Sequence, residues 1–136
     1  MKRVILCLTV AGFLAVPASS VATTLPNNSV IVDVLFTNQR TIVAYYQGET
    51  LGNGTPGYQA FVGTIARGSF LHFKVFNRSS KPHQFTAFGK TTPVIKPGKN
   101  AYFNKLAKVR GKFPYRDVLT KKPKAYPGST GTFVIA

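Results

Sequence analysis

Apolar and polar residues alternate along most of the chain in short runs. The runs are rich in Val, Ile, Phe, Tyr and Thr, and each is bounded by Gly, Pro, Asn or Ser. No apolar pattern of helical period persists for more than about two turns. About seven strands at spacings near ten residues predict an all-β fold, a Greek-key antiparallel β-sandwich. The expected strands cover residues 29–37, 58–65, 69–76, 84–88, 100–106, 111–116 and 130–135.

Three segments fit this strand pattern less well. Residues 41–46 (TIVAYY) suit either a strand or a single helical turn. Residues 47–57 (QGETLGNGTPG) predict a Gly-rich loop that can act as a recognition tip. Residues 120–129 combine Lys, Pro and Gly in a basic connection, and their prolines exclude a central strand.

The alternation at residues 69–76 predicts which residues of this strand face the core. It places Leu71, Phe73 and Val75 on the buried face. His72 falls on the opposite face beside Lys74, so we expect a surface histidine there rather than a metal ligand.

The first 22 residues have the pattern of a secretory signal peptide. Lys2 and Arg3 precede an apolar run at residues 4–16, and small residues offer cleavage after Ser20 or Ala22. The apolar run is shorter than the roughly 20 residues that a spanning helix needs, which makes a retained anchor the weaker alternative. We therefore expect a periplasmic or secreted protein with one domain at residues 23–136.

The cysteine count excludes several kinds of chemistry. Cys7 is the only cysteine, and it lies within the signal peptide. The mature chain is then expected to have no disulfide, structural zinc thiolate, iron–sulfur cluster or thiol catalysis.

The chain is strongly basic, with 18 Lys and Arg against 3 Asp and Glu and a formal net charge of +15. Loss of Lys2 and Arg3 leaves +13, and such a surface attracts anions, although high charge can also serve solubility alone. We expect docking on an acidic protein partner or an anionic envelope component. Nucleic acid is not expected, since nothing brings an exported protein to it and the interleaved aromatics suit the core. The predicted partner-binding residues are Lys105, Lys108, Arg110, Lys112, Arg116, Lys121, Lys122 and Lys124.

The sequence gives little support for an enzyme. No second carboxylate lies near Asp117, and neither a Gly-x-Ser-x-Gly elbow nor a phosphate-cradling loop occurs. Ser79 and Ser80 precede His83 closely, but a turn explains them. We expect a non-enzymatic protein.

The order of motifs from Arg67 to Ala136 resembles the cupredoxins, the plastocyanin-like blue copper domains. A strand ends at Asn77, a Pro-His step follows at His83, and Pro97 with Gly98 looks like the family's turn. The strand GKFPYRD and the final strand GTFVI complete the order. The resemblance implies a cupredoxin-like sandwich with His83 as the first histidine ligand.

The same resemblance implies a degenerate copper site. Asp117 stands where the family has its cysteine, Ser129 falls about where the axial methionine would be, and no histidine lies between them. Type-1 copper needs two imidazoles and a thiolate, so we expect no cofactor. His83 and Asp117 would form at most a weak or vestigial metal pair.

Two roles for Asp117 follow from this degenerate site. The simpler one is an ion pair with the neighbouring cations. If the old ligand pocket is still buried, a bond between Asp117 and His83 would close it without metal. One functional alternative stays open: a copper-binding or electron-transfer protein that uses His83 in a non-standard or partner-completed site.

Overall fold

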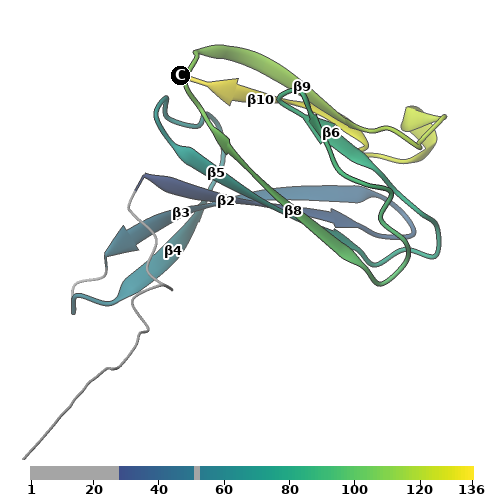
Figure 1. Cartoon of the computed structure of the whole chain (residues 1–136), viewed down its shortest axis with the longest axis horizontal. Coiled ribbons are helices and arrows are strands. Elements are labelled where there is room, and N and C mark those ends of the chain that lie inside the picture. The colour runs from purple at the N-terminus through teal and green to yellow at the C-terminus, as the bar shows by residue number, and fades with distance from the viewer. Residues whose placement is uncertain (1–27, 51–52) are drawn as a thin grey trace, which may run out of the picture.

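The computed structural model describes residues 28–50 and 53–136, which form two facing β-sheets (Figure 1). The five-stranded sheet has the order β4-β3-β2-β5-β8 and the four-stranded sheet the order β10-β9-β6-β7. The first contains β2 (Ser29–Phe36), β3 (Thr41–Thr50), β4 (Pro56–Phe61), β5 (Phe70–Asn77) and β8 (Asn100–Leu106). The second contains β6 (Phe85–Ala87), β7 (Lys90–Thr91), β9 (Gly111–Asp117) and β10 (Thr130–Ile135). The predicted all-β Greek-key sandwich is confirmed.

The core forms from alternate residues of β2 and β5, as the sequence pattern predicts. Val32 and Phe73 are opposite each other where these two strands pair in parallel, and both are buried. Phe73 stacks on Phe103 with ring centroids 4.4 Å apart and meets Phe133 edge-on. Burial of each such ring contributes roughly 1.5–3 kcal/mol to folding. His72 lies on the outer face, which confirms the predicted strand phase.

The predicted loop at residues 47–57 is wrong for residues 47–50 and 56–57, which belong to strands, and residues 41–46, for which a strand or a helical turn was open, form a strand. β3 runs from Thr41 to Thr50 and pairs with β2 on one side and with β4 on the other. The ladder with β2 ends at Gln47, and Gly48 pairs with Tyr58 of β4, so the ladder with β4 alone outweighs the low strand propensity of glycine there. The opening proline of β4, Pro56, is the first residue of its strand, where proline is tolerated.

Smaller boundary differences affect the other strands. β4 ends at Phe61, and Ile65 instead forms an isolated bridge with Ile135. β6 is shorter than expected, while β9 is one residue longer and includes Asp117. Residues 120–129 form the predicted connection, with a short 3-10 helix at Pro123–Ala125.

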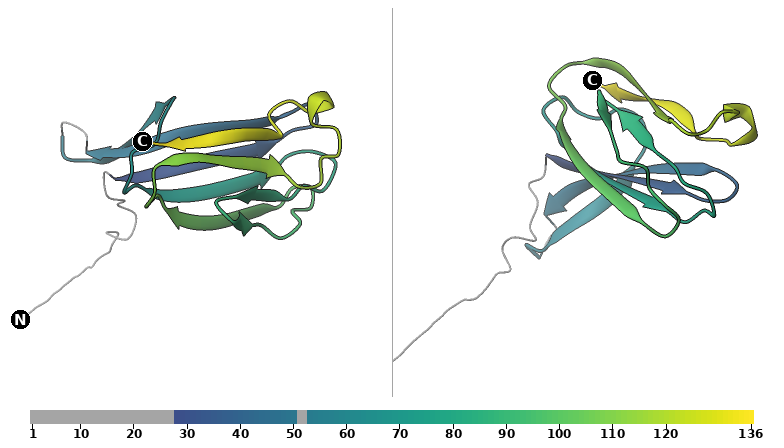
Figure 2. Two further views of the ribbon diagram at one scale, coloured as in Figure 1. Left: turned by 90° about the horizontal axis from the view of Figure 1, so that it is seen from above. Right: turned by 45° about the vertical axis from the view of Figure 1, so that its right-hand side comes forward.

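The loops after β2, β5 and β9 meet at one end of the sandwich, here called the site end. Phe36 pairs with Asn77 at the last position of the β2–β5 ladder, and Phe85 pairs with Asp117. Figure 2 shows these loops gathered at the end away from the C-terminus. The turn at residues 96–99 also lies there, since Asn77 donates its backbone N–H to Lys99. No helix in the described part of the chain is long and apolar enough to span a membrane.

The predicted signal peptide, including Cys7, lies outside the described residues.

Candidate functional site

His83 lies at the site end with its imidazole held between two aromatic rings. The residue is 6% exposed, and its backbone bridges Ile95 on the neighbouring segment. The Phe36 ring stacks on one side, with centroids 4.3 Å apart and planes 7° from parallel. Tyr126 stacks on the other side at 5.4 Å. The two rings fix the plane of the imidazole, so its two nitrogens point in set directions.

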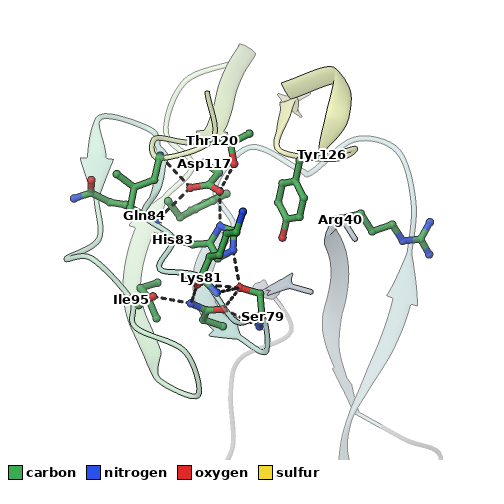
Figure 3. A network of polar contacts seen from close by, with 12 residues as sticks. Arg40, Ser79, Lys81, His83, Gln84, Ile95, Asp117, Thr120 and Tyr126 are labelled. Atoms are coloured by element: carbon green, nitrogen blue, oxygen red, sulfur yellow. Dashed lines mark hydrogen bonds and ion pairs between the residues drawn. The ribbon is translucent and has the colours of Figure 1, made fainter. Parts of the chain in front are cut away.

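Asp117 accepts a hydrogen bond from one of these nitrogens. His83 Nδ1 donates to Asp117 Oδ2 at 2.5 Å, and the aspartate side chain is fully buried (Figure 3). Thr120 Oγ1 donates to the same oxygen at 2.5 Å. The other oxygen, Oδ1, accepts the backbone N–H groups of Gln84 at 3.1 Å and Leu119 at 3.2 Å. Because four donors converge on it, the carboxylate is hydrogen-bonded at both oxygens in its ionised form.

This geometry decides between the two expected roles of Asp117. The expected bond to His83 is present. No ion pair joins Asp117 to a Lys or Arg of the described part of the chain, and its ionic partner there is His83. Arg116 is exposed while Asp117 faces inward, as the alternation of β9 requires.

Asn77 holds the loop that carries the second partner of His83. Its Nδ2 donates to the carbonyls of Lys81 at 2.8 Å and Ile95 at 2.7 Å. Its Oδ1 accepts the N–H of Ser79 at 2.9 Å and contacts the Ser79 hydroxyl at 2.8 Å. Ser79 Oγ then lies 2.8 Å from His83 Nε2. The fully buried asparagine thus places the serine against the imidazole.

Ser79, His83 and Asp117 form a hydrogen-bonded relay, and the serine hydroxyl also has polar neighbours outside the relay. Its Oγ has four polar neighbours: Asn77 Oδ1, the carbonyl of Lys81, the N–H of Lys81 and His83 Nε2. A hydroxyl has one hydrogen, so Asn77 Oδ1, the Lys81 carbonyl and a neutral His83 Nε2 compete for it, while the N–H of Lys81 donates to the hydroxyl oxygen. The hydroxyl can donate to a neutral His83, or turn to Asn77 and accept from a doubly protonated His83. Either protonation state of the imidazole therefore keeps its hydrogen bond.

The donor atoms do not fit a type-1 copper ion. A metal bound at about 2.0–2.1 Å to both ligands holds a nitrogen and an oxygen donor roughly 3.3 Å apart in tetrahedral geometry. The His83–Asp117 contact is much shorter. No third ligand lies near, since His72 is on the outer face and its Nδ1 contacts Asn104 at 3.1 Å. The described residues contain no group of three His, Cys, Asp or Glu that could hold a metal ion.

Ser129 lies beside Asp117, as the resemblance implies. Its carbonyl accepts the Asp117 N–H at 2.7 Å, and the residue is buried. Its hydroxyl has no hydrogen-bond partner in the described part of the chain. A serine hydroxyl is a poor replacement for the methionine thioether as a copper ligand.

Tyr126 joins the β9–β10 connection to the β2–β3 turn. Its hydroxyl donates to the carbonyl of Thr37 at 2.7 Å. Burial raises the pKa of the Tyr126 hydroxyl, so the phenol keeps its donor proton at neutral pH. This hydrogen bond therefore joins two segments of the site that are distant in sequence.

The eight predicted partner-binding cations divide between the two ends of the sandwich. Arg116 and Lys121, Lys122 and Lys124 lie at the site end, and the other four lie where β8 ends and β9 begins. The fold adds five exposed cations from other segments to the site end. Together these nine are Arg40, Arg78, Lys81, Lys96, Lys99, Arg116, Lys121, Lys122 and Lys124. The predicted partner-binding residues did not include these five, whose segments are brought to this end by strand pairing.

A cavity of about 520 Å³ opens at the centre of the site end. Its walls come from residues 79–83, residues 119–126 and the β2–β3 turn. His83 and Ser79 line it, and Lys81, Lys121 and Lys122 stand around it. No carboxylate belongs to its lining.

The sequence matches no protein-family model and no curated protein. Among solved structures, it is similar to a chain of the mixed-disulfide complex between a thioredoxin-like protein and subunit II of cytochrome c oxidase. That match has 12% identity, covers 85% of this chain and 87% of that chain, and has a TM-score of 0.52.

Two further solved structures are similar at lower TM-scores. Reduced auracyanin from Roseiflexus castenholzii has 12% identity, coverage of 80% and 97%, and a TM-score of 0.49. A purple cupredoxin from Nitrosopumilus maritimus has 16% identity, coverage of 79% and 98%, and a TM-score of 0.39. At 12% identity the match to the oxidase complex shows the fold alone, which is cupredoxin-like.

Proposed function

We propose that this chain, a β-sandwich of cupredoxin-like fold, is an exported, non-enzymatic binding module that docks an acidic partner protein or an anionic envelope component through its site end. One observation carries the proposal. Nine exposed cations surround the site end, whereas Asp117, the one carboxylate described there, is buried against His83. The surface charge at this end is therefore positive throughout.

Such an arrangement favours association with anions in two ways. Exposed cations of one sign raise the encounter rate with a negative partner and orient it toward the charged end. Because the described part of the chain pairs none of these cations with a carboxylate, a partner does not need to break an existing ion pair to reach them. The strands behind them are well packed and present the loops on a rigid frame.

The proposal is tested with two double variants that remove equal charge at opposite ends. Lys96→Glu with Lys99→Glu changes the site end, and Lys108→Glu with Lys112→Glu is the matched control. Retention on immobilised polyglutamate, and on vesicles that contain phosphatidylglycerol, is measured between about 20 and 500 mM salt. We expect retention to fall steeply with salt and to drop about tenfold in the site-end variant, with a change of less than about threefold in the control.

Two results would contradict electrostatic docking at this end. One is retention that does not change with salt. The other is an equal loss in both double variants, which would mean that net charge alone governs binding. Which of the two immobilised anions retains the protein distinguishes an acidic protein from an anionic surface.

The copper alternative rests on the contact between the imidazole of His83 and the carboxylate of Asp117. The same contact weakens it, because both carboxylate oxygens already accept two hydrogen bonds each. A metal would have to displace protein donors and separate two buried groups. The docking function is therefore the better supported of the two.

A further inference from the structure

The cavity at the site end has the size and lining of a small-ligand site. Its volume of about 520 Å³ lies within the range of roughly 300–1,000 Å³ that is usual for such pockets. Three separate segments form its walls, and the Tyr126–Thr37 hydrogen bond ties two of them together. The pocket is therefore part of the folded structure rather than a gap between independent loops.

Two separate loops bring positive charge to this pocket. Lys81 comes from the loop after β5 and lines the pocket together with His83. Lys121 and Lys122 come from the connection after β9. In the described part of the chain, none of these three ammonium groups forms an ion pair. An anion bound in the pocket would thus have lysines from each of the two loops available for charge-assisted hydrogen bonds.

The buried carboxylate of Asp117 near the pocket does not prevent an anion from binding. Asp117 lies below His83 with a fully buried side chain and hydrogen bonds at both oxygens, so its charge is locally compensated. His83 Nε2 lies 2.8 Å from Ser79 Oγ, so this nitrogen is already hydrogen-bonded within the network. The network beneath the pocket can therefore accommodate a bound negative group without leaving a donor unpaired.

The remaining wall is apolar. Pro82, Leu119, Ala125 and Tyr126 line it, and Leu119 is 40% exposed. Such a surface can cover the hydrocarbon part of a ligand whose charged group contacts the lysines.

We infer that this pocket is a specific binding site for a single oxyanion group, a carboxylate or a phosphate, bound by Lys81 from the loop after β5 and by Lys121 and Lys122 from the connection after β9. The group belongs either to a small organic anion or to an acidic side chain of a docked protein. Only the second source rests on the proposed docking function. The site differs from the surrounding charged surface because it needs a cavity of defined shape.

The test uses two probes, phenyl phosphate for a free organic anion and a tetraglutamate peptide for a protein side chain. Binding of each is measured by calorimetry to the wild-type protein and three variants. Lys121→Gln with Lys122→Gln removes two pocket charges, and Lys108→Gln with Lys112→Gln removes equal charge at the opposite end. Ala125→Trp fills the pocket without any change in charge.

We expect saturable one-to-one binding of at least one probe. The pocket double variant and Ala125→Trp should each weaken it about tenfold or more, and the distant control less than about twofold. Binding of phenyl phosphate assigns the site to a free organic anion. Binding of the peptide alone assigns it to a partner side chain.

Three results would overturn the inference: no saturable binding of either probe at up to about 10 mM, equal losses in both double variants, or unchanged binding in Ala125→Trp. Circular dichroism and thermal unfolding verify that each variant is folded. Retention of Ala125→Trp on polyglutamate separates the two proposals, because the diffuse docking surface survives in that variant even if the pocket is blocked. Loss of the pocket site with retained docking would leave the proposed function intact.

Discussion

The imidazole of His83 and the carboxylate of Asp117 are in direct contact, with Nδ1 and Oδ2 2.5 Å apart at the buried end of a cupredoxin-like sandwich. Resemblance to blue copper domains places two copper ligands at these positions. Here a carboxylate stands in place of the thiolate, and it bonds directly to the histidine. A metal is not needed to satisfy either group, because both nitrogens of His83 and both oxygens of Asp117 have partners.

The first prediction concerns the stability that this contact provides. Asp117→Ala removes the acceptor of four donors, and we expect it to lower the free energy of unfolding by about 3–5 kcal/mol. Asp117→Asn keeps the shape and one oxygen, so its cost should be roughly 1–3 kcal/mol. Urea unfolding at pH 7 measures both values. A stability of Asp117→Ala equal to that of the wild type would show that the pair is not structural.

The second prediction concerns copper. Because the contact leaves no space for an ion and no third ligand lies near, Cu(II) should bind more weakly than about 1 µM. His83→Ala should leave that affinity unchanged, whereas His72→Ala removes the more accessible imidazole and should lower any weak binding. Competition titration against a chelator of known affinity measures both. A sub-micromolar complex that disappears in His83→Ala would favour metal handling instead.

Strand phase was predictable from the sequence, whereas the β3–β4 hairpin was not. In β5 the alternation of large apolar residues specifies which side is buried, so Phe73 and His72 were placed correctly. In β3 the glycine and polar residues after Tyr46 resemble a loop, because strand propensity reflects only local preference. This end of β3 is a strand because it pairs with β4, and the propensity of the individual residues does not show that pairing.

The site was predictable only in part, for a related reason. Resemblance placed His83 and Asp117 together, and the structure does the same. The Ser79 contact depends on Asn77 folding the loop back, and the stacking of Phe36 on His83 depends on the β2–β5 register. Likewise, Arg40 and Lys81 share the site end with Lys121 only because three loops converge there. No local pattern in the sequence encodes these contacts.

The third prediction concerns Gly128 in the Pro-Gly step before β10. Its φ is +79°, and an added Cβ would lie only 2.1 Å from the carbonyl oxygen of Thr41. Thr41 donates its N–H to Pro127 across the same contact, so the backbone cannot easily move away. We expect Gly128→Ala to lower the free energy of unfolding by more than about 2 kcal/mol.

Gly98 supplies the matched control for this prediction. It has the same φ of +79°, but an added Cβ would meet nothing within 4 Å. Gly98→Ala should therefore cost only the left-handed conformational penalty of about 1–2 kcal/mol. Thermal and urea unfolding of both variants compare the two positions. Equal losses would mean that backbone conformation alone, and not the contact with Thr41, requires glycine at position 128.

The fourth prediction concerns the pH dependence of Asp33, in the middle of β2. Burial raises the pKa of the Asp33 carboxyl above 3.8, an effect that the nearby Lys74 partly offsets. Its Oδ1 is buried without a hydrogen-bond partner in the described part of the chain. Because the folded protein holds this proton more tightly than the unfolded chain, the carboxyl becomes destabilising as pH rises from about 4 through the raised pKa. Stability from this residue is therefore greatest in acid and lower at pH 7.

Replacement by the neutral amide tests that sign. Asp33→Asn should raise the free energy of unfolding at pH 7 by less than about 1 kcal/mol, because the carboxyl is only partly buried and solvent screens its charge. The gain should disappear near pH 3, where wild-type Asp33 is protonated in both states. Lys74→Gln should destabilise the wild type at pH 7 but have little effect in the Asp33→Asn background, since the ionised carboxylate is then absent. A stability gain that persists unchanged at pH 3 would locate the effect in packing rather than in charge.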